Sequence, residues 1–463
     1  MKIQVKKLGA LEQAEFELGD MTIICGNNNT GKTYATYALF GFLSFWREAF
    51  SIRISEEKIL QLLNEGTIEL DLQDYIKNAQ KILKQGCKAF TEQLPTVFAS
   101  SGKYFSESEF MVDLDIRDIH PVKTYEKTIG AANTQIFSIS KKTGSKNVNI
   151  SLLVEKEKVK IPQNIIYRII GDALKEIIFG HLFPHPFIAS AERTGAAIFR
   201  KELNFARNRL LEQMSSMEKD INPFEFLTKV YSDYALPVKT NVDFTRQLED
   251  VAKKDSFISK QHPEILNEFA NIIGGEYLVT KNDELYYVPK GKRIKLTMDE
   301  SSSAVRSLLD IGFYLLHVAQ PRDLLMVDEP ELNLHPENQR RVARLFARLV
   351  NLGIKIFITT HSDYIIKELN TLIMLNHDKK HLKLIMEKEG YCQEELLSAG
   401  KVRVYIAEEK LVCKEGNKRS SRCLTLVPAD IDPELGIEAR SFDITIDAMN
   451  RIQEAIIFSG EDV

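Results

Sequence analysis

Three short apolar runs in this chain are each followed by polar residues with chemical potential. Residues 21–25 precede a glycine-rich loop and a helical pattern at 34–46. Residues 324–327 precede two carboxylates, and residues 355–360 precede a histidine. Continuous apolar runs of this length are typical of strands buried on both faces, which occur in parallel sheets covered by helices. The pattern therefore predicts an α/β fold with a core of mixed sheet and helices.

The rest of the periodicity predicts further elements around that core. These are a helical stretch over 43–94, antiparallel hairpins over 108–159, a helix over 161–178, a strand over 186–190, a mostly helical stretch over 197–270, a hairpin over 276–288, a helix from the serines at 301–303 to Ala319, and tail strands near 382–386, 402–406 and 423–427. A last helix is predicted over 444–457.

The order of these elements predicts a core domain that is discontinuous in sequence. The expected parts are 1–42 and 290–376 for the core, 43–107 for a helical insertion, 108–196 for hairpins, a helix and a strand that complete the core, 197–289 for a helical insert with a hairpin, and 377–463 for a small C-terminal α/β tail.

Composition limits the class of protein more than its function. The 61 basic and 65 acidic residues give a net charge of −4, so no overall field attracts a polyanion, although local basic stretches occur at 200–209 and 414–422. Five cysteines without C-x-x-C spacing favour a reduced cytosolic protein. No apolar stretch approaches the ~20 residues of a membrane span, and the first residues carry no signal sequence. We expect a cytoplasmic protein with no membrane partner.

The glycine-rich loop has the spacing G-x-x-x-x-G-K-T. Its residues are Gly26, Asn27, Asn28, Asn29, Thr30, Gly31, Lys32 and Thr33. Glycines allow such a loop to wrap a phosphate with backbone N–H groups, and the following helix N-terminus adds the positive end of its dipole. Lys32 is predicted to reach the β- and γ-phosphates of ATP, and the Thr33 hydroxyl to ligate Mg²⁺.

The paired carboxylates complete this predicted site. Asp328 stands where the strand 324–327 ends and is expected to hold Mg²⁺, while Glu329, on the other side of the pleat, polarises the attacking water. His361 ends the next strand along the chain. We predict phosphoryl transfer from ATP to water.

A turn of small residues precedes the carboxylates. Ser301, Ser302 and Ser303 stand before a helical pattern and could present hydroxyl and N–H groups to an anion, or could form an ordinary helix cap. Glu192 and Arg193 follow the strand 186–190 and are a candidate for residues near the nucleotide, with a surface loop as the alternative.

In this order the loop, serine turn, carboxylates and histidine resemble the ATP-binding-cassette (ABC-type) ATPases of the SMC, RecN and OLD kind. The resemblance implies that the serines form a signature loop touching the γ-phosphate held by the opposite subunit. It also implies that residues 331–336 are the D-loop, and that His361 is a switch histidine acting with Glu329 and Lys32 in catalysis. The family normally has glycine after the serine, where this chain has Ala304, so we expect slow turnover.

At a finer level the chain resembles the standalone ATPase subunits of bacterial anti-phage systems such as PARIS and Septu. The runs 191–195, 301–309 and 441–443 carry this resemblance. It implies an ATP-dependent homodimer or higher homo-oligomer that senses infection and controls a separate effector chain, a nuclease or toxin. A DNA repair ATPase of the RecF or RecN kind, acting on DNA ends, is the alternative. A transporter motor and a purely structural role for ATP are further readings.

No nuclease of its own is predicted in this chain. The tail after His361 contains a single D-x-D, Asp430-Ile431-Asp432, between two prolines, and this pattern favours a turn over a metal site.

Overall fold

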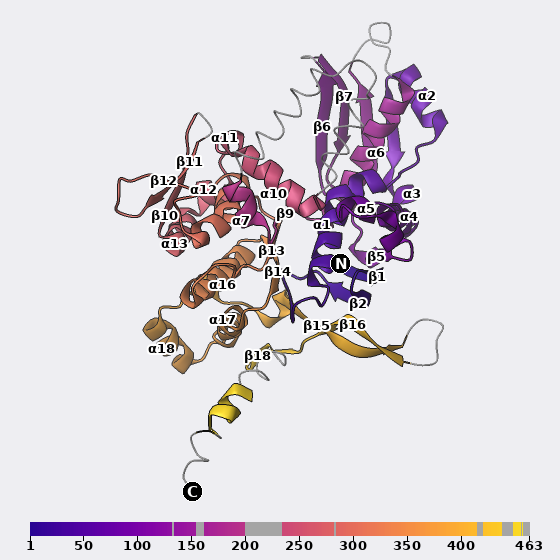
Figure 1. Cartoon of the computed structure of the whole chain (residues 1–463). Helices are drawn as coiled ribbons and strands as arrows, with labels where there is room; N and C mark the ends of the chain where they lie inside the picture. Colours follow the sequence, from indigo (N-terminus) through magenta and orange to yellow (C-terminus); the bar gives the residue numbers. More distant parts are fainter. Residues whose placement is uncertain are drawn as a thin grey trace, which may run out of the picture. The chain divides into compact units, whose positions relative to one another are not determined.

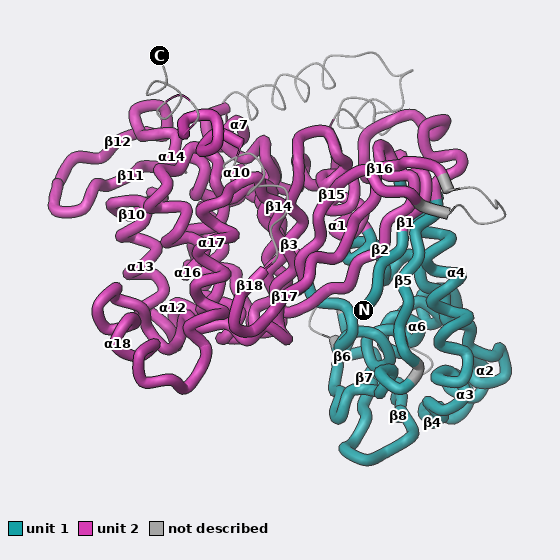
Figure 2. The backbone as a smooth tube through the Cα atoms, turned by 90° about the horizontal axis from the view of Figure 1, so that it is seen from below, with its two compact units in different colours: residues 1–4, 42–94, 109–185 teal, residues 5–41, 95–108, 186–463 magenta. Residues whose placement is uncertain are grey.

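A computed structural model describes residues 1–131, 134–153, 162–199, 234–281, 284–413, 420–437, 448–454 and 456. These residues form two compact units, coloured teal and magenta in Figure 2. Unit 1 comprises Met1–Gln4, Phe42–Leu94 and Glu109–His185, and unit 2 comprises Val5–Gly41, Pro95–Ser108 and Pro186–Val463. Much of the stretch predicted as helical at 197–270, and the basic residues at 200–209 and 414–419, lie outside the described residues.

A six-stranded sheet forms the centre of unit 2 (Figure 1). Its strands, in spatial order, are β16 (Ser420–Pro428), β15 (Val402–Cys413), β3 (Met21–Gly26), β14 (Lys355–Thr360), β13 (Leu324–Asp328) and β9 (Pro186–Ala189). All neighbours pair in parallel except β15 and β16. The three apolar runs of the sequence are therefore the adjacent strands β3, β14 and β13. The predicted α/β fold class, with a mixed sheet, is confirmed.

Both faces of this sheet are covered, which is why its central strands are continuously apolar. On one face Ile23, Val327 and Ile358 belong to a core shared with helices α16 (Pro336–Asn351) and α17 (Asp363–Met374). On the other face the ring of Phe16, from β2 (Leu11–Glu17), lies 6.1 Å from the rings of both Phe357 and Tyr405. The strand ends that carry the polar motifs are thus fixed by packing on two sides.

The remaining elements belong to unit 2, or run from one unit into the other. They are β1 (Lys2–Leu8), α1 (Lys32–Ala49), α5 (Leu94–Val97), η1 (Gly102–Phe105), α7 (Arg193–Ile198), α10 (Leu236–Arg246), α11 (Leu248–Val251), α12 (Phe257–Gln261), α13 (Pro263–Ile273), β10 (Gly275–Val279), β11 (Leu285–Pro289), β12 (Leu296–Thr297), α14 (Ser303–Ser307), α15 (Leu309–Phe313), η3 (Tyr314–Val318), α18 (Lys380–Glu389), η4 (Gln393–Glu395), η5 (Ala399–Lys401), β17 (Ile431–Asp432) and β18 (Gly436–Ile437).

Unit 1 is built on a four-stranded antiparallel sheet in the order β4-β8-β7-β6. Its elements are α2 (Glu56–Glu65), β4 (Thr67–Asp71), α3 (Leu72–Lys77), α4 (Ala79–Thr91), β5 (Glu109–Asp113), η2 (Ile116–Asp118), β6 (Tyr125–Ala131), β7 (Thr134–Lys141), β8 (Asn147–Leu152) and α6 (Gln163–Phe179). An aromatic cluster that includes Trp46, Phe50 and Phe183 packs beside α6 residue Phe179. None of the helices described in either unit is both long and apolar enough to cross a membrane.

Several predicted elements were wrong. The stretch 43–94 is not helical throughout, because β4 lies within it and pairs with β8. Residues 382–386 are not a strand but part of α18, whose end is marked by Gly390 in the left-handed conformation (φ +71°). The helix predicted up to Ala319 is broken into α14, α15 and the π-helical η3. The hairpins around 134–152 and 275–289 are confirmed.

Replacing Gly26 tests how tightly the end of β3 is packed. Gly26 has φ +133°, and a Cβ there would lie 2.6 Å from the Ala407 carbonyl oxygen. Gly353 has φ +86° but open space around the same atom. Both alanine variants carry backbone strain, but only Gly26→Ala adds a clash, which typically costs about 1–3 kcal/mol. We expect a lower thermal midpoint for Gly26→Ala than for Gly353→Ala. Equal thermal midpoints for the two variants would show that β15 can shift away from the added Cβ at little free-energy cost.

Candidate nucleotide-binding site

The loop Gly26–Thr33 joins β3 to α1, the strand–loop–helix arrangement that phosphate binding requires. Asn29 and Gly31 have φ of +62° and +89°. A Cβ at Gly31 would lie 2.7 Å from Leu11 Cγ, so the close approach of β2 leaves room only for glycine there. The loop is therefore shaped by its neighbours as well as by its own glycines.

Lys32 is buried inside this loop. Its ammonium group donates to the carbonyl oxygens of Gly26 (3.1 Å) and Asn27 (2.7 Å). Burial lowers the pKa of Lys32, and the nearby carboxylates of Glu329 and Asp328 oppose that shift. The predicted phosphate-binding lysine thus lies among negative groups, with its hydrogen bonds satisfied by the loop.

An open pocket of about 640 Å³ lies at the carboxyl ends of the parallel strands. It is lined by Ala10, Asn28, Asn29, Thr30, Gly31, Lys32, Thr33, Tyr34, Glu329 and His361. Most predicted site residues, from segments some 300 positions apart in sequence, are therefore brought to one cavity. Gly26 and Asn27 do not line the pocket, but their backbone carbonyls accept hydrogen bonds from Lys32.

Asp328 and Glu329 take different positions at the end of β13. Asp328 is buried and accepts a hydrogen bond from the Thr359 hydroxyl, and burial raises its pKa to about 6. Glu329 lies beyond the strand, with φ +50°. The predicted alternation along the pleat does not extend to Glu329, because β13 ends at Asp328; the Glu329 side chain lines the pocket, whereas that of Asp328 does not.

Glu329 contacts the predicted switch histidine directly. Its carboxylate lies 3.4 Å from Nε2 of His361, and this hydrogen bond lowers the pKa of Glu329. The backbone N–H of His361 donates to Glu331 (2.6 Å), as does the Thr360 hydroxyl (2.9 Å). Glu331, which the resemblance placed in the D-loop, therefore fixes the turn that carries His361.

The three predicted serines do not line this pocket. Ser301 is buried and donates to the Met298 carbonyl (2.7 Å), and Ser302 caps α14 by accepting from the Val305 N–H (3.3 Å). Ser303 Oγ accepts from Arg306 (3.2 Å). The capping alternative therefore describes Ser302 within one copy of the chain, and the predicted role across a subunit boundary stays a prediction.

Arg193, which the sequence offered with Glu192 as a candidate near the nucleotide, does not line the pocket but contacts the backbone of the paired carboxylates. It is fully buried, so the surface-loop alternative was wrong for it. Its guanidinium donates to the backbone carbonyls of Asp328 (2.6 Å), Glu329 (2.8 Å) and Ser307 (2.7 Å). The neighbouring Glu192 accepts from the Tyr37 hydroxyl of α1 (3.2 Å). The position of Arg193 just after a buried parallel strand was the signal available in the sequence.

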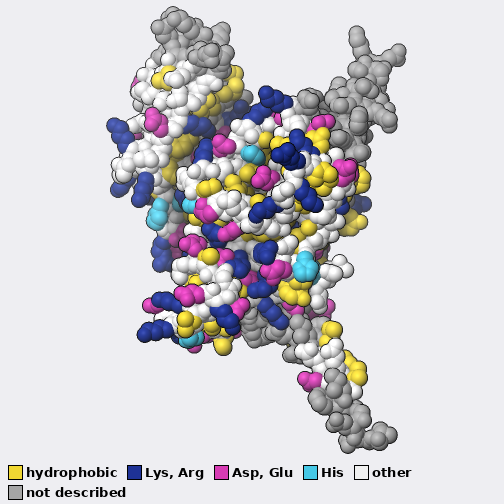
Figure 3. Space-filling model, turned by 90° about the vertical axis from the view of Figure 1, so that its left-hand side faces the viewer, with side chains coloured by type: hydrophobic (Ala, Val, Ile, Leu, Met, Phe, Trp, Pro, Cys, Tyr) yellow, Lys and Arg dark blue, Asp and Glu magenta, His cyan; other side chains and the backbone are white. Residues whose placement is uncertain are grey.

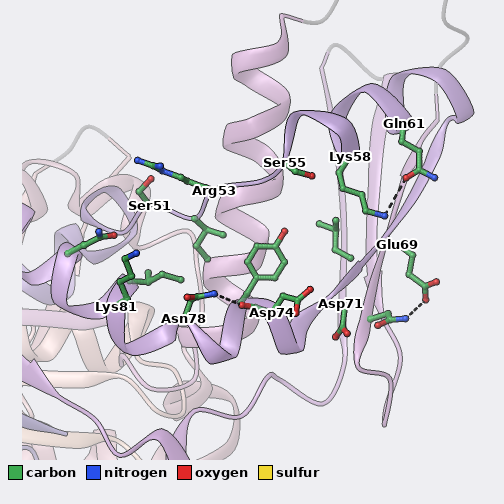
Figure 4. A pocket seen from close by; sticks show the side chains of 16 residues that line it. Ser51, Arg53, Ser55, Lys58, Gln61, Glu69, Asp71, Asp74, Asn78 and Lys81 are labelled. Atoms are coloured by element: carbon green, nitrogen blue, oxygen red, sulfur yellow. Dashed lines mark hydrogen bonds between the residues drawn. The ribbon is translucent and has the colours of Figure 1, made fainter.

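A larger cavity, of about 1280 Å³, lies in unit 1 between α2, α3, α4 and β4 (Figure 4). Its polar lining is partly paired, as in the hydrogen bonds from Lys58 to Gln61 and from Asn147 to Glu69. None of the residues that the motifs selected lines it. The Asp430–Asp432 motif in unit 2 does not form the predicted turn itself: Ile431 and Asp432 form strand β17, and the turn follows at 433–435, where Asp432 accepts from the N–H groups of Glu434 and Leu435.

The fold and this pocket define a P-loop ATPase of the mixed α/β type. A family model described as AAA ATPase domain matches residues 1–366, and the chain belongs to that family. It is therefore an ATPase-family protein built to bind ATP.

Comparisons beyond the family add little. No curated protein matches the chain. Similar solved structures, all at 12% identity, include an SMC head bound to the C-terminal winged-helix domain of ScpA (TM-score 0.33; 92% of this chain, 97% of that one). Two more are an SMC head domain from Thermotoga maritima (0.30; 93% and 98%) and an SMC head with an extended coiled coil bound to a ScpA domain derived from Pyrococcus furiosus (0.31; 98% and 98%). This likeness is too distant to bear on the site.

The Thr359–Asp328 hydrogen bond gives a direct test of the site's stability. Thr359→Val keeps the shape of a fully buried side chain but leaves the Asp328 carboxylate without its hydroxyl donor. Losing a hydrogen bond to a charged group costs about 1.5–3 kcal/mol. Thr371→Val on α17, which loses only a bond from an exposed hydroxyl to the Lys367 carbonyl, should cost less than about 0.5 kcal/mol. Similar losses of thermal midpoint in both variants would contradict this account of Asp328.

Proposed function

We propose that this chain is an ATP-hydrolysing sensor or scaffold subunit of a bacterial anti-phage defence system. In this proposal ATP drives assembly of a homodimer or larger homo-oligomer, and the assembly controls a separate effector chain, a nuclease or toxin. The observation that carries the ATPase part is the single pocket shared by the glycine-rich loop, Glu329 and His361. The defence part rests on the resemblance carried by the runs 191–195, 301–309 and 441–443.

The proposed roles follow from where each group lies. The backbone N–H groups of residues 26–33 and the Lys32 ammonium bind the phosphates, and Lys32 exchanges its bonds to the loop carbonyls for bonds to phosphate oxygens. Glu329, whose pKa is lowered, is the carboxylate that orients water for attack. His361 lies against Glu329 and is placed to respond to the γ-phosphate.

Magnesium is the expected metal, and the donors fit it. Mg²⁺ prefers oxygen ligands and is usually held by one or two carboxylates together with substrate phosphates and water. The exposed Thr33 hydroxyl lines the pocket, and the Asp328 carboxylate is buried at the end of β13, with β14 between that strand and β3. Among the described residues no group of three His, Cys, Asp or Glu side chains could hold a metal by itself. Thr33 and Asp328 would therefore hold Mg²⁺ jointly with the nucleotide, where it neutralises phosphate charge.

The carboxylate proposed to orient water is hydrogen-bonded to the histidine proposed to contact the γ-phosphate. This contact fixes the two side chains relative to one another in the pocket. The serines proposed to complete the site belong to another copy, so slow turnover is expected of an isolated chain.

The alternative of a DNA repair ATPase has little support on the face drawn in Figure 3. On the face drawn in Figure 3, basic and acidic side chains are interspersed over unit 2 rather than gathered by sign. Non-specific DNA binding depends on clustered cations. We therefore keep DNA as a partner to be tested by the salt dependence of ATP turnover with and without DNA.

Glu329→Gln should separate ATP binding from ATP hydrolysis. The amide keeps the size of the side chain but cannot accept a proton from water, so we expect ATP turnover to fall at least 100-fold while ATP still raises the thermal midpoint. The trapped ATP state should shift the mass distribution toward a dimer or larger assembly, measured by light scattering with ATP and with ADP.

Glu394→Gln, at an exposed carboxylate of the same unit, is the matched control and should behave as wild type. Lys32→Ala should lose the thermal shift with ATP altogether, since it removes the cation at the centre of the loop. Retained ATP affinity in Lys32→Ala would mean that the nucleotide binds elsewhere. An unchanged mass distribution in Glu329→Gln would remove ATP-driven assembly from the proposal.

The effector requires an experiment in the native host. Tagged Glu329→Gln, purified with ATP or with ADP, should retain one nuclease- or toxin-like chain in only one nucleotide state, identified by mass spectrometry. Recovery of DNA and repair proteins instead would favour the repair alternative.

A further inference from the structure

The strongest unassigned feature of unit 2 is the buried guanidinium of Arg193. It is 1% exposed, and it makes four hydrogen bonds, all to backbone carbonyls. A buried cation that spends its donors on main-chain oxygens fixes backbone geometry, because the planar fork of arginine presents its N–H groups in fixed directions. The four carbonyls come from three separate segments of the chain.

Two of those carbonyls belong to the paired carboxylates. Nη1 donates to the Asp328 carbonyl (2.6 Å) and Nη2 to the Glu329 carbonyl (2.8 Å). Glu329 has a left-handed backbone, which costs energy in a residue with a side chain. Arg193 therefore stabilises the unusual backbone that turns the Glu329 side chain into the pocket.

A third carbonyl belongs to the helix that the serine turn begins. Nε donates to the Ser307 carbonyl (2.7 Å), at the end of α14. The helix is interrupted at Leu308, between α14 and α15, so the Ser307 carbonyl does not lie within a continuous helix. Helices α7, which begins with Arg193, and α14 lie side by side (Figure 2).

Hydrogen bonds join the serine turn to α14. Arg306, on α14, donates back to the carbonyls of Met298 (3.0 Å) and Ser301 (2.6 Å), and Ser302 caps the same helix. The serine turn is therefore linked through α14 to the Ser307 carbonyl, which accepts from Arg193.

The position of Arg193 is itself fixed from the opposite side. Nη1 also donates to the Ser190 carbonyl (2.8 Å), and the N–H of Ser190 donates to the buried side chain of Asn241 (2.7 Å). Burial lowers the pKa of Arg193, and among the nearby carboxylates that of Asp310, on α15, opposes this shift most. The guanidinium is thus anchored to the end of β9 and balanced by a charge on the helix after the break.

We propose that Arg193 is a positioning residue that couples the serine turn to the carboxylates of the ATP site through the backbone carbonyls of Ser307, Asp328 and Glu329. When the serines meet a nucleotide held by a second copy, Arg193 transmits the shift of α14 to the Glu329 turn of its own copy. This inference rests on the proposed ATPase function and adds a route between two sites of one assembly.

Arg193→Lys tests the coupling while keeping the charge beside Asp310. A lysine ammonium is a single point of donors and cannot span carbonyls from three segments. We expect kcat for ATP hydrolysis to fall at least tenfold, with KM for ATP changed less than threefold, because the groups that bind phosphate are untouched. Arg344→Lys is the matched control, since Arg344 also donates to a backbone carbonyl beside a buried carboxylate, that of Glu395, and does not line the pocket.

If Arg193 has only a structural role, Arg193→Lys should lower kcat no more than Arg344→Lys does when the two variants lose the same amount of thermal midpoint. That result would overturn the proposal. Amide hydrogen exchange without nucleotide gives a second readout that needs no ATPase activity. Peptides covering 301–309 and 326–333 should exchange faster together in Arg193→Lys. Faster exchange confined to 188–199 would also overturn the coupling.

The two experiments keep the proposals distinguishable. A wild-type chain that neither binds nor hydrolyses ATP would remove the proposed function, while the exchange comparison would still decide whether Arg193 links the two segments. If Arg193→Lys does not fold, the wild-type chain is compared with and without a non-hydrolysable ATP analogue at monomer concentrations. Joint protection of 301–309 and 326–333 is then expected, and protection of 326–333 alone contradicts the coupling.

Discussion

The carboxyl ends of three adjacent parallel strands, β3, β14 and β13, determine where the polar motifs of unit 2 meet. Parallel strands in register deliver whatever follows them to the same edge of a sheet, which is where ligands bind in α/β folds. Asp328 pairs with Thr359, and Thr359 pairs with Ile24, so the phosphate loop, Glu329 and His361 line one pocket, with Asp328 buried at the same edge of the sheet. Packing on both faces of the sheet fixes the positions of these strand ends, and with them the residues of the site.

Several charged groups are buried at this edge of the sheet, and the free-energy cost of removing them from water is offset by their hydrogen-bond partners and by opposite charges. Asp328, Lys32 and Arg193 are all buried, and burial is the largest effect on the pKa of each. Isolated charges in such a place would be strongly destabilising, so they occur with opposite charges and hydrogen-bond partners. The Thr359 hydroxyl donates a hydrogen bond to Asp328. Loop carbonyls accept from Lys32, and four backbone carbonyls accept from Arg193. The buried charges of this site are therefore each matched by hydrogen-bond partners within the chain.

The sequence predicted the parts of the site that depend on local spacing. A strand, a glycine-rich loop and a helix have to be neighbours, so the place of Lys32 could be derived. The backbone of Glu329 could not, because its left-handed conformation depends on contacts with Thr359 and Arg193 from other segments. Strand β4 was missed for a similar reason: five residues between helices form a strand only because β8 lies beside them. The helical pattern at 382–386 was hidden by an apolar run on an exposed helix.

The most direct test of this account is an experimental structure of Glu329→Gln with ATP and Mg²⁺. The account predicts nucleotide phosphates against residues 26–33, the metal at Thr33 and Asp328, and the γ-phosphate between His361 of one copy and the Ser301–Ser303 turn of another. Nucleotide bound away from the 26–33 loop would contradict the site itself. Nucleotide in the loop of a single copy, with the serine turn facing solvent, would contradict the shared site and leave an ATPase that acts alone.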